Sequence, residues 1–585
     1  MATPETQPND INSSSSIQVT SSPKRKHGGW ITIPFILGSA LGLGLANGGV
    51  SANLVVYLIK RFRLKSIDAA QIYNIINGCV SVAPFAGAII TDSFLGCYMV
   101  IFISSIISLL EGHREMFKFP KSQPQVRPHS KSMILLTLTT IHPLRPLSCA
   151  NGSKTCEAPT TLQVAVLYTG IALMTIGIGG TRVNMATMGA NQFNNPKVQG
   201  SFFNWYFFVT FVASIAATVG LVYIEDNVGW VLGFGLCILF NAIGVVVFFL
   251  GRHYYQHHIP EGSPFTGLAR VMVAAIKKRN MRVSSESKDY YYGHDGTVGS
   301  APPSSSLSFL NHAALKSGNG QLENPLARPW SLCTVEQVED LKTIIKIIPL
   351  WSTSIFLSTP IATQVGLLVL QALSMDRHLG PHISIPAGSF LVFSLLPTVV
   401  SLPIVDRIIY PTWQKLTGRY PTALQRIGVG HIFNIISMVG FALLESRRLH
   451  VVHSHQLENQ PNSVAPISAL WLVVPLAILG CGEAFHGPGS VAFYYQEFPK
   501  SVASTATAMA TLVAGISFYL STVIIGLMRR VTTWLPNNMN QTRLDNVYWV
   551  LTVVGVLNFG YFLSCTWLYK NQNLSKDRDD TSSSS

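Results

Sequence analysis

A single arginine stands inside an apolar stretch of the N-terminal half. Arg182 follows Gly179-Gly180-Thr181 in a run that begins near Thr161 and is long enough to cross a hydrocarbon core. An arginine near the middle of such a span costs about 2.5–3.5 kcal/mol on insertion scales, so it normally faces a polar cavity or a partner. We favour an arginine that faces a substrate. The alternative is an arginine that extends along the span to the polar membrane surface.

Glu483 and His486 form a second ionisable pair inside an apolar stretch. The two residues are three positions apart and therefore share one face of a helix. Gly487-Pro488-Gly489 follows directly and predicts a local break in the helix that exposes backbone groups to a ligand. The functional interpretation is a ligand or proton site. The structural interpretation pairs Glu483 with Arg182 or a neighbouring helix, and makes His486 a cap of the break.

Composition places the chain among polytopic membrane proteins. Hydrophobic residues make up 48% and charged residues 12% of the 585 positions, against about 25% charged residues in soluble domains. The formal net charge of +14 is therefore assigned to loops that flank membrane spans and not to a nucleic-acid surface. The sequence contains no Gly-x-Ser-x-Gly, no His-Glu-x-x-His and no Cys/His cluster with metal-ligand spacing. It therefore predicts no enzyme, no metal site and no cofactor.

Twelve apolar stretches predict twelve membrane spans. They lie near 30–59, 72–95, 98–140 (interrupted), 163–187, 202–223, 229–250, 343–374, 384–409, 421–445, 467–494, 501–528 and 545–569. An even number of spans places both termini on one side of the membrane. Basic residues before the first span and in the central loop indicate that this side is the cytosol. One basic loop falls outside on this count and contradicts the rule, with Lys60, Arg61, Arg63 and Lys65.

The spans divide the chain into two halves joined by a polar segment. The expected organisation is a disordered cytosolic tail (1–27), an N-terminal six-helix bundle (28–250), a cytosolic central loop (251–337), a C-terminal six-helix bundle (338–570) and a cytosolic tail (571–585). Within the central loop, 264–278 predicts an amphipathic helix on the membrane surface, and 283–328 reads as a flexible linker.

The third span is interrupted by a basic, proline-containing segment. Residues 98–110 and 133–140 together have the length of one crossing, but 111–132 carries three prolines and five basic residues. Proline every four residues cannot continue a helix, and five cations cannot lie in lipid. We interpret 111–132 as an insertion into one ancestral helix. The alternative is a pair of short re-entrant half-helices.

Two sequons fall in predicted outside loops. Asn151 and Asn540 each begin an Asn-x-Ser/Thr pattern and are candidate glycosylation sites. Cys149 and Cys156 flank the first sequon, where an extracellular disulfide could persist. The other six cysteines are scattered singly and are expected to be small apolar fillers.

Several blocks of the sequence resemble the plant nitrate/peptide transporter family. The blocks are Gly179-Gly180-Thr181-Arg182, Gly189-Ala190-Asn191-Gln192-Phe193, Phe202-Phe203-Asn204-Trp205-Tyr206, Cys333-Thr334-Val335-Glu336-Gln337, Leu424-Gln425-Arg426-Ile427-Gly428 and Trp534-Leu535-Pro536-Asn537-Asn538. The family is one of the proton-dependent oligopeptide transporters of the major facilitator superfamily. The resemblance extends from Trp30 to Lys570. It implies an all-α polytopic membrane protein with the major facilitator fold, that is, twelve transmembrane helices in two six-helix bundles.

The resemblance also locates the positions that carry proton coupling and gating in such transporters. The Glu-x-x-Glu-Arg/Lys cluster of the first span falls on Ala40, Leu43 and Gly44, so all three ionisable groups are missing; Asn47 and Asn53 are the polar side chains left there. The seventh-span region that holds a nitrate-binding histidine in one branch reads 359–364 here and ends on Gln364. Asp92 and Asp406-Arg407 occupy corresponding loop positions of the two halves and are the expected gating residues, although Cys97 stands where an arginine is expected.

These substitutions favour a small anion as substrate. A cavity that keeps Arg182 and loses fixed carboxylates tolerates an anionic ligand, because the alternative is an unpaired buried cation. Arg182, Glu483, His486, Asn47 and Gln364 are the candidate substrate-binding residues. By resemblance, the loss of the first-span acids is a trait of the nitrate-excretion subgroup, which releases nitrate or chloride through the plasma membrane. The alternatives are a transporter of larger organic anions or peptides and a non-transporting sensor or inactive relative.

Overall fold

The computed structural model describes residues 28–110, 160–193, 196–256, 264–284, 286–293, 303–316, 330–381, 383–460, 463–498 and 503–583. The predicted N-terminal tail (1–27), the predicted insertion 111–132 and the predicted first sequon Asn151 with Cys149 and Cys156 lie outside these residues.

The N-terminal half is a bundle of long apolar helices. Its elements are η1 (Gly29–Thr32), α1 (Ile33–Ala52), α2 (Leu54–Lys60), α3 (Ser66–Ile90), the π-helix η2 (Thr91–Leu95), α4 (Gly96–Leu110), α6 (Thr161–Ala190), α7 (Pro196–Ala216), the π-helix η4 (Ala217–Leu221), α8 (Val222–Asn227), α9 (Trp230–Leu250) and η5 (Gly251–His253).

The C-terminal half has the same character. Its helices are α11 (Val335–Leu373), η8 (Ala387–Leu391), α12 (Val392–Ile404), the π-helix η9 (Val405–Ile409), α13 (Tyr410–Thr417), α14 (Ala423–Ser454), η10 (Ala469–Leu472), α15 (Val473–Glu497), α16 (Ala503–Val531) and α17 (Leu544–Ser583). Short strands connect some of them: β1 (Met375–Asp376) pairs with β4 (Ala465–Ser468) in parallel, and β2 (His378–Leu379) with β3 (Ile383–Ser384) in antiparallel fashion.

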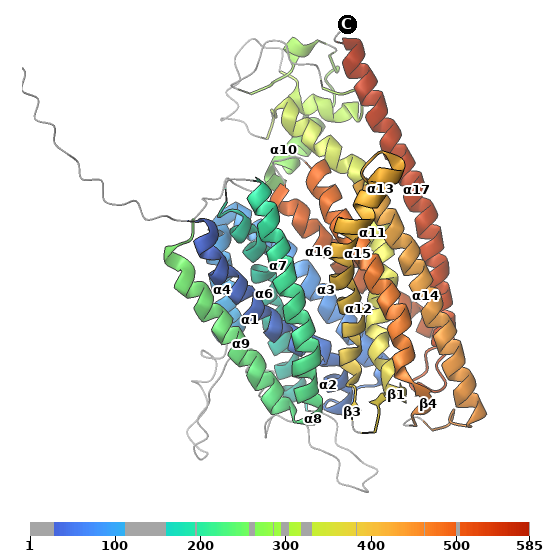
Figure 1. The fold of residues 1–585 in the computed structure, drawn as a ribbon. Coiled ribbons are helices and arrows are strands. Elements are labelled where there is room, and N and C mark those ends of the chain that lie inside the picture. Colours follow the sequence, from blue (N-terminus) through green and yellow to red (C-terminus); the bar gives the residue numbers. More distant parts are fainter. Residues whose placement is uncertain are drawn as a thin grey trace, which may run out of the picture.

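The helices account for the predicted membrane spans. Eleven stretches of the described chain are long and apolar enough to cross a membrane. One of them, Ser66–Ser108, contains both α3 and α4. The chain turns between these two helices at Gly96, whose positive φ of 71° suits a residue without a Cβ. Counted with α3 and α4 as two, the stretches match the twelve predicted spans, the third of them only in its first part, 98–110. Figure 1 shows the long helices lying side by side.

Three of the long helices begin with the same sequence device. Thr160, Thr334 and Thr422 each accept a hydrogen bond from the backbone N–H three residues later, at 3.2–3.3 Å. In each case the threonine N–H donates in turn to the side-chain oxygen of the glutamine at that third position. This capping box satisfies two N–H groups that an apolar helix would otherwise leave without acceptors. It fixes the starts of α6, α11 and α14.

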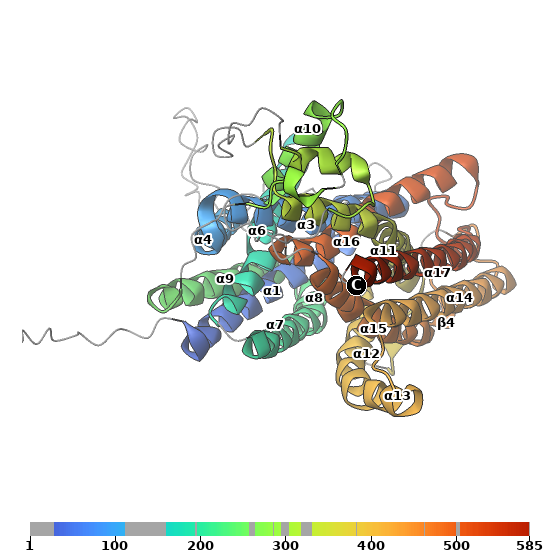
Figure 2. The same cartoon turned by 90° about the horizontal axis from the view of Figure 1, so that it is seen from above.

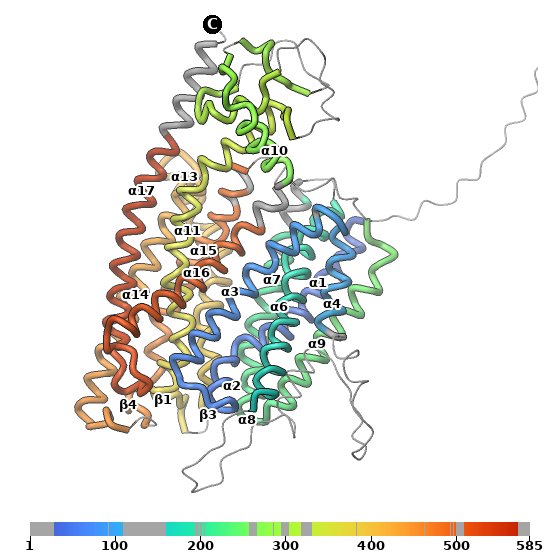
Figure 3. Tube along the Cα trace, turned by 180° about the vertical axis from the view of Figure 1, so that it is seen from behind, coloured from blue at the N-terminus to red at the C-terminus, as the bar shows by residue number. Residues whose placement is uncertain are grey.

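The chain path defines two faces of the molecule, one at each end of the spans. We call the end that carries Gly28, the central segment and the end of α17 the terminal face, and the other end the opposite face (Figure 1). Seen along the spans, the blue-to-green and yellow-to-red helices occupy separate sides of the molecule (Figure 2). α3 and α16 run side by side between them (Figure 3), where a Cβ on Gly515 would lie 2.5 Å from a methyl of Val82.

Polar contacts between the halves gather toward the opposite face. Ser521 Oγ of α16 accepts hydrogen bonds from Asn74 Nδ2 of α3 at 3.0 Å and from Thr363 Oγ1 of α11 at 2.8 Å. Closer to the face, Arg529 of α16 forms an ion pair with Asp68 of α3. The buried core at this level also draws apolar residues from both halves. The halves are therefore closed against each other at the opposite face.

The described part of the central segment is packed rather than flexible. α10 (Pro264–Lys277) places Val271 and Ala274 against the 3-10 helix η7 (Ser308–Ala314) and the beginning of α11. Tyr290, at an isolated bridge to Leu315, is buried in the same cluster; burial raises the pKa of its phenol, whose OH donates to the Ser284 carbonyl at 2.6 Å. The predicted flexible linker is thus wrong for 286–293 and 303–316. The apolar face of α10 covers protein, which the periodicity of 264–278 alone did not distinguish from a membrane surface.

The last helix continues into the predicted C-terminal tail. α17 continues as a helix through 571–583, beyond the apolar part of the span. The sequence there is polar and lacks helix-breaking glycine or proline, so the helix has no local reason to end at the membrane.

Candidate functional site

Arg182 lies on the side of the N-terminal bundle that is turned toward the C-terminal bundle. Its neighbours in α6 define the directions: Gly179 packs against Ala83 of α3, and Gly189 packs against Phe202 of α7. Arg182 lies between these two sectors, and both helices contact the C-terminal half, α3 through α11 and α16 and α7 through α12. At 1.5 Å per residue it is about 12 Å inside the end of α6 at Ala190.

The guanidinium of Arg182 is available to a ligand. Its side chain is exposed, and the structure shows no ion pair or side-chain hydrogen bond to it among the described residues. The Tyr206 hydroxyl of α7 donates to the Arg182 carbonyl at 2.8 Å and so holds the backbone at this position. Arg182 is therefore an exposed cation of α6, in the sector between α3 and α7.

Glu483 and His486 line a narrow crevice inside the C-terminal half. The crevice lies between α11, α14 and α15 and is too narrow to admit a water molecule in this conformation. Its other lining residues are Leu357, Ile361, Gly430, Asn434, Leu479 and Gly482. Both ring nitrogens of His486 are buried without a hydrogen-bond partner among the described residues, as is Asn434 Oδ1. Unsatisfied groups of this kind are costly, so we expect a rearrangement of α11, α14 and α15 in the transport cycle to supply partners for them.

The structure separates this crevice from Arg182. Within the described residues Glu483 forms no ion pair, with Arg182 or with any other cation. Glu483 lies about 21 Å inside the end of α15 at Glu497, deeper than Arg182 in α6. The predicted pairing of Glu483 with Arg182 is therefore absent in this conformation.

The predicted helix break after His486 is wrong. α15 continues through Pro488 to Glu497. The glycines instead allow close packing against α14: a Cβ on Gly482 would lie 2.8 Å from Cβ of Phe433, and one on Gly489 would lie 3.1 Å from Cβ of Arg426. His486 consequently lies inside a continuous helix and does not cap a break.

The first-span positions that lack acids are filled by apolar packing. Ala40 and Leu43 are buried in a cluster with Ile36 and Met185. A Cβ on Gly44 would lie only 2.9 Å from Cβ of Ala213 in α7. Asn47, one turn further along, is half-buried and forms no described side-chain hydrogen bond. The three positions that lack ionisable groups are therefore closely packed and do not line a polar cavity.

Gln364 is fully buried in α11, and neither side-chain atom has a hydrogen-bond partner among the described residues. The neighbouring Thr363 takes part in the contact with Asn74 and Ser521 that joins the halves. Gln364 thus lies beside the closure between the halves and does not reach the Glu483 crevice, whose lining it does not enter.

The expected gating residues lie at matching positions of the backbone. Asp92 is in the π-helix η2 after α3, and Asp406 and Arg407 are in the π-helix η9 after α12. Both π-helices end spans at the terminal face, which agrees with the repeat that the sequence predicts. Asp406 and Arg407 are exposed and lie 3.9 Å apart, so this conformation shows no tight anchor on the C-terminal side.

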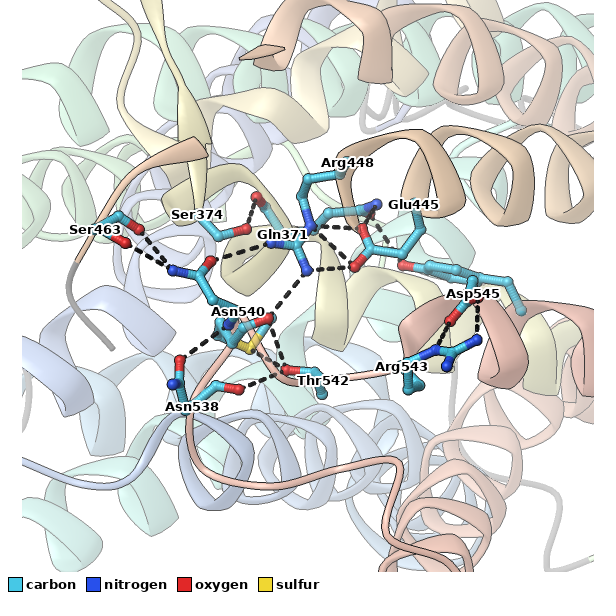
Figure 4. A network of polar contacts seen from close by, with 12 residues as sticks. Gln371, Ser374, Glu445, Arg448, Ser463, Asn538, Asn540, Thr542, Arg543 and Asp545 are labelled. Atoms are coloured by element: carbon cyan, nitrogen blue, oxygen red, sulfur yellow. Dashed lines mark hydrogen bonds and ion pairs between the residues drawn. The ribbon is translucent and has the colours of Figure 1, made fainter. Parts of the chain in front are cut away.

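Asn540 is buried, contrary to its prediction as a glycosylation site. Its side chain is 3% exposed, and its Nδ2 atom donates to the carbonyls of Leu457, Gln460 and Ser463 and to Ser463 Oγ at 2.9–3.3 Å. Figure 4 shows this amide directed into the protein. A glycan on Nδ2 would remove these bonds and has no room. The sequon arises here from a structural asparagine.

Two buried acids were not predicted from the sequence. Glu445 forms a fully buried ion pair with Arg448 in α14, bridged to Gln371 of α11 (Figure 4). Glu225, at the end of α8, is 1% exposed with neither carboxylate oxygen partnered among the described residues. The spacing of Glu445 and Arg448 by three residues inside an apolar run is a signal that could have identified the pair. Glu225 gave no such signal, because it stands beside Asp226 and Asn227 in what reads as a loop.

Comparisons with known proteins agree with this architecture. The model of the POT family, PTR2, matches residues 98–544. The chain is 48% identical over 563 residues to Protein NRT1/PTR FAMILY 2.7 of Arabidopsis thaliana, with 96% of each chain covered. It is 48% identical over 555 residues to Protein NRT1/PTR FAMILY 2.6 of the same plant, with 94% of this chain and 95% of the relative covered.

Solved structures give the same fold. The crystal structure of the POT family transporter PepTSo superposes with a TM-score of 0.63 at 17% identity, covering 93% of this chain and 99% of that one. The predicted family and the predicted major facilitator fold are both confirmed. The chain belongs to the POT family of membrane transporters and is a relative of the plant NRT1/PTR FAMILY proteins.

Proposed function

We propose that this transporter moves small anions, with nitrate or chloride as substrate, by alternating access. The observation that carries the proposal is the exposed Arg182 guanidinium between the bundles, with no described ion pair. A fixed cation in such a place attracts an anion and is stabilised by it.

The apolar packing of Ala40, Leu43 and Gly44 supports an inorganic anion over a peptide. A peptide carries an amino group that is best bound by a carboxylate. Between Trp30 and Tyr57 the first span contains no acid, and Asn47 is one of the polar side chains that it keeps. Glu483 remains in the C-terminal half, but it lines a crevice too narrow to admit a water molecule in this conformation.

The conformation supports the direction of access. The halves are closed at the opposite face, whereas Arg182 is exposed nearer the terminal face. We place the terminal face in the cytosol of a plant cell and the protein in the plasma membrane, where it releases nitrate or chloride. Arg182 would then meet the anion on the side from which efflux starts.

Flux measurements in proteoliposomes test the proposal. Nitrate, chloride and a dipeptide are compared with and without a pH gradient, for the wild type, Arg182→Ala and Arg419→Ala. Arg419 is an exposed arginine on the loop after α13 and serves as the matched control. We expect nitrate or chloride flux in the wild type and Arg419→Ala and its loss in Arg182→Ala. Dipeptide flux without anion flux would overturn the substrate class, and the absence of all flux would favour a non-transporting relative.

A further inference from the structure

Glu225 is a buried acid that the proposed anion site does not use. It lies in α8 near the opposite face, and α9 makes room for it: a Cβ on Gly233 would lie 2.2 Å from Cγ of Glu225. Its side chain is 1% exposed and neither oxygen has a hydrogen-bond partner among the described residues. The neighbouring Asp226 differs, because it pairs with Lys60 of α2.

Asn53 lies beside Glu225 at an interruption of the first span. The residue separates α1 from α2, and it is 1% exposed. Asn53 interacts with the Glu225 side chain, yet no hydrogen bond of good geometry satisfies its amide among the described residues. Two adjoining polar side chains are thus buried without adequate partners.

The element that covers this pair belongs to the other half of the molecule. η8, between α11 and α12, brings Gly388 so close that a Cβ there would lie 2.6 Å from the Ala52 carbonyl and 3.1 Å from Asn53 Oδ1. The next residue, Ser389, donates from Oγ to the Thr218 carbonyl of η4 at 2.7 Å. η8 therefore closes over the interruptions in α1–α2 and α7–α8, and Glu225 lies beneath the closure.

The protonation state of Glu225 must depend on that closure. A buried carboxylate without partners carries a large desolvation cost, which the group avoids by binding a proton. When the halves separate at the opposite face, η8 leaves Asn53 and Thr218, and water can reach and stabilise the ionised carboxylate.

None of the charged and titratable groups that the structure describes around Glu225 forms an ion pair with its carboxylate. The α8 neighbour is Asp226, α2 contributes Tyr57 and the paired Lys60, and α9 contributes the Cys237 thiol. The described residues of η4 and η8 contain no titratable group. Of the two cations nearby, Lys60 is paired with Asp226, and Arg61, which follows α2, lies against the turn between α8 and α9 and makes contacts of its own.

We propose that Glu225 is a proton-binding site of the closure at the opposite face: it is protonated while η8 is seated and releases the proton when the halves part there. Acid on that side then favours the closed state, and alkaline conditions favour opening. The proposal rests on the proposed transport by alternating access, but it holds whatever ion is carried.

The test reads the closure directly and needs no substrate. Ser389→Cys, in full-length protein in proteoliposomes, is labelled by a membrane-impermeant maleimide applied at the opposite face, at a series of pH values. Labelling is measured above that of the parent protein, and maleimide reactivity is corrected with a free thiol at each pH. We expect corrected labelling to rise with pH, by at most about tenfold per pH unit for one titrating proton. Adding Glu225→Gln should leave it low and independent of pH, whereas the control Asp226→Asn should keep the rise.

Two outcomes overturn the proposal. One is an unchanged pH dependence in Glu225→Gln; the other is absence of labelling at every pH in a protein that transports. If Glu225→Gln does not reach the membrane, Glu225→Asp keeps the carboxyl group and must move the midpoint of the pH dependence. An unchanged midpoint then counts against the proposal. Loss of anion flux with intact pH-dependent labelling would overturn the proposed function alone.

Discussion

Arg448 binds Glu445 one helical turn away, and neither side chain reaches solvent. Nη2 of Arg448 lies 2.6 Å and Nε lies 3.0 Å from Glu445 Oε1. Nη2 also donates to the Met539 carbonyl at 3.0 Å, and Gln371 Nε2 of α11 donates to Glu445 Oε2 at 2.7 Å. The pair therefore connects α11, α14 and the loop before α17 within the C-terminal half. It fixes one bundle and does not join the two.

Removing one member of this pair should destabilise the C-terminal bundle. Glu445→Ala leaves Arg448 buried with an uncompensated charge, which costs about 3–5 kcal/mol. We expect a clear fall in the thermal unfolding temperature of the purified protein in detergent. The double substitution Glu445→Leu with Arg448→Met removes both charges and should recover most of the loss. A double variant that is no more stable than Glu445→Ala would contradict this account.

Arg182→Ala should reduce anion flux at least tenfold while the protein still reaches the membrane. The reason is the loss of the fixed charge between the bundles, at a side chain whose removal breaks no described hydrogen bond. Arg182→Lys keeps the charge but loses the planar guanidinium, so we expect partial flux. Initial rates at equal surface expression, with Arg419→Ala as control, measure the effect. Normal nitrate flux in Arg182→Ala would exclude Arg182 as a substrate ligand.

The reversal potential of the anion current should not follow a pH gradient. The first-span positions Ala40 and Leu43 carry no carboxylate and are packed with apolar neighbours, so they cannot carry a transported proton. Voltage clamp of expressing oocytes measures this potential. It separates coupling from rate, because protonation of Glu225 changes how fast the cycle runs but not the energy that drives it. A shift corresponding to one proton per anion, abolished by Glu483→Gln, would instead make Glu483 a coupling site.

Asn540 should carry no glycan in the folded transporter, because the two N–H groups of its amide are shared among four acceptors inside the protein. Asn540→Gln should therefore leave the electrophoretic mobility unchanged, with or without glycosidase treatment. It should lower thermal stability, since the longer side chain cannot reproduce the same bonds. Asn151→Gln provides the comparison at the other sequon. A glycosidase-sensitive band that disappears only in Asn540→Gln would show that the buried conformation is not the one that is processed.

The sequence predicted the spans well because a bilayer requires about 20 apolar residues for each crossing. The predicted bounds were less exact: α11 begins at Val335 and not near 343, at one of the capping boxes, with threonine and glutamine three residues apart, that the prediction did not use. It failed where a short pattern has two uses. Gly487-Pro488-Gly489 reads as a break but serves close packing, and the Asn540 sequon reads as a surface site but is buried. The burial of Glu225 could not be predicted from the sequence, because it depends on η8, more than 150 residues away along the chain.

The packing of the central segment has a practical consequence. Lys342 of α11, 1% exposed, donates to the Ser304 carbonyl at 2.8 Å, and Glu339 of α11 accepts from Ser304 N–H at 2.9 Å. Together with the apolar contacts of α10, these bonds fasten the segment to the first turns of the C-terminal bundle. If the exposed Met272 of α10 is replaced by cysteine and labelled with a fluorophore, the dye should therefore move together with the C-terminal bundle. Paired with a second dye on the N-terminal bundle, it converts the rocking of the halves into a distance signal.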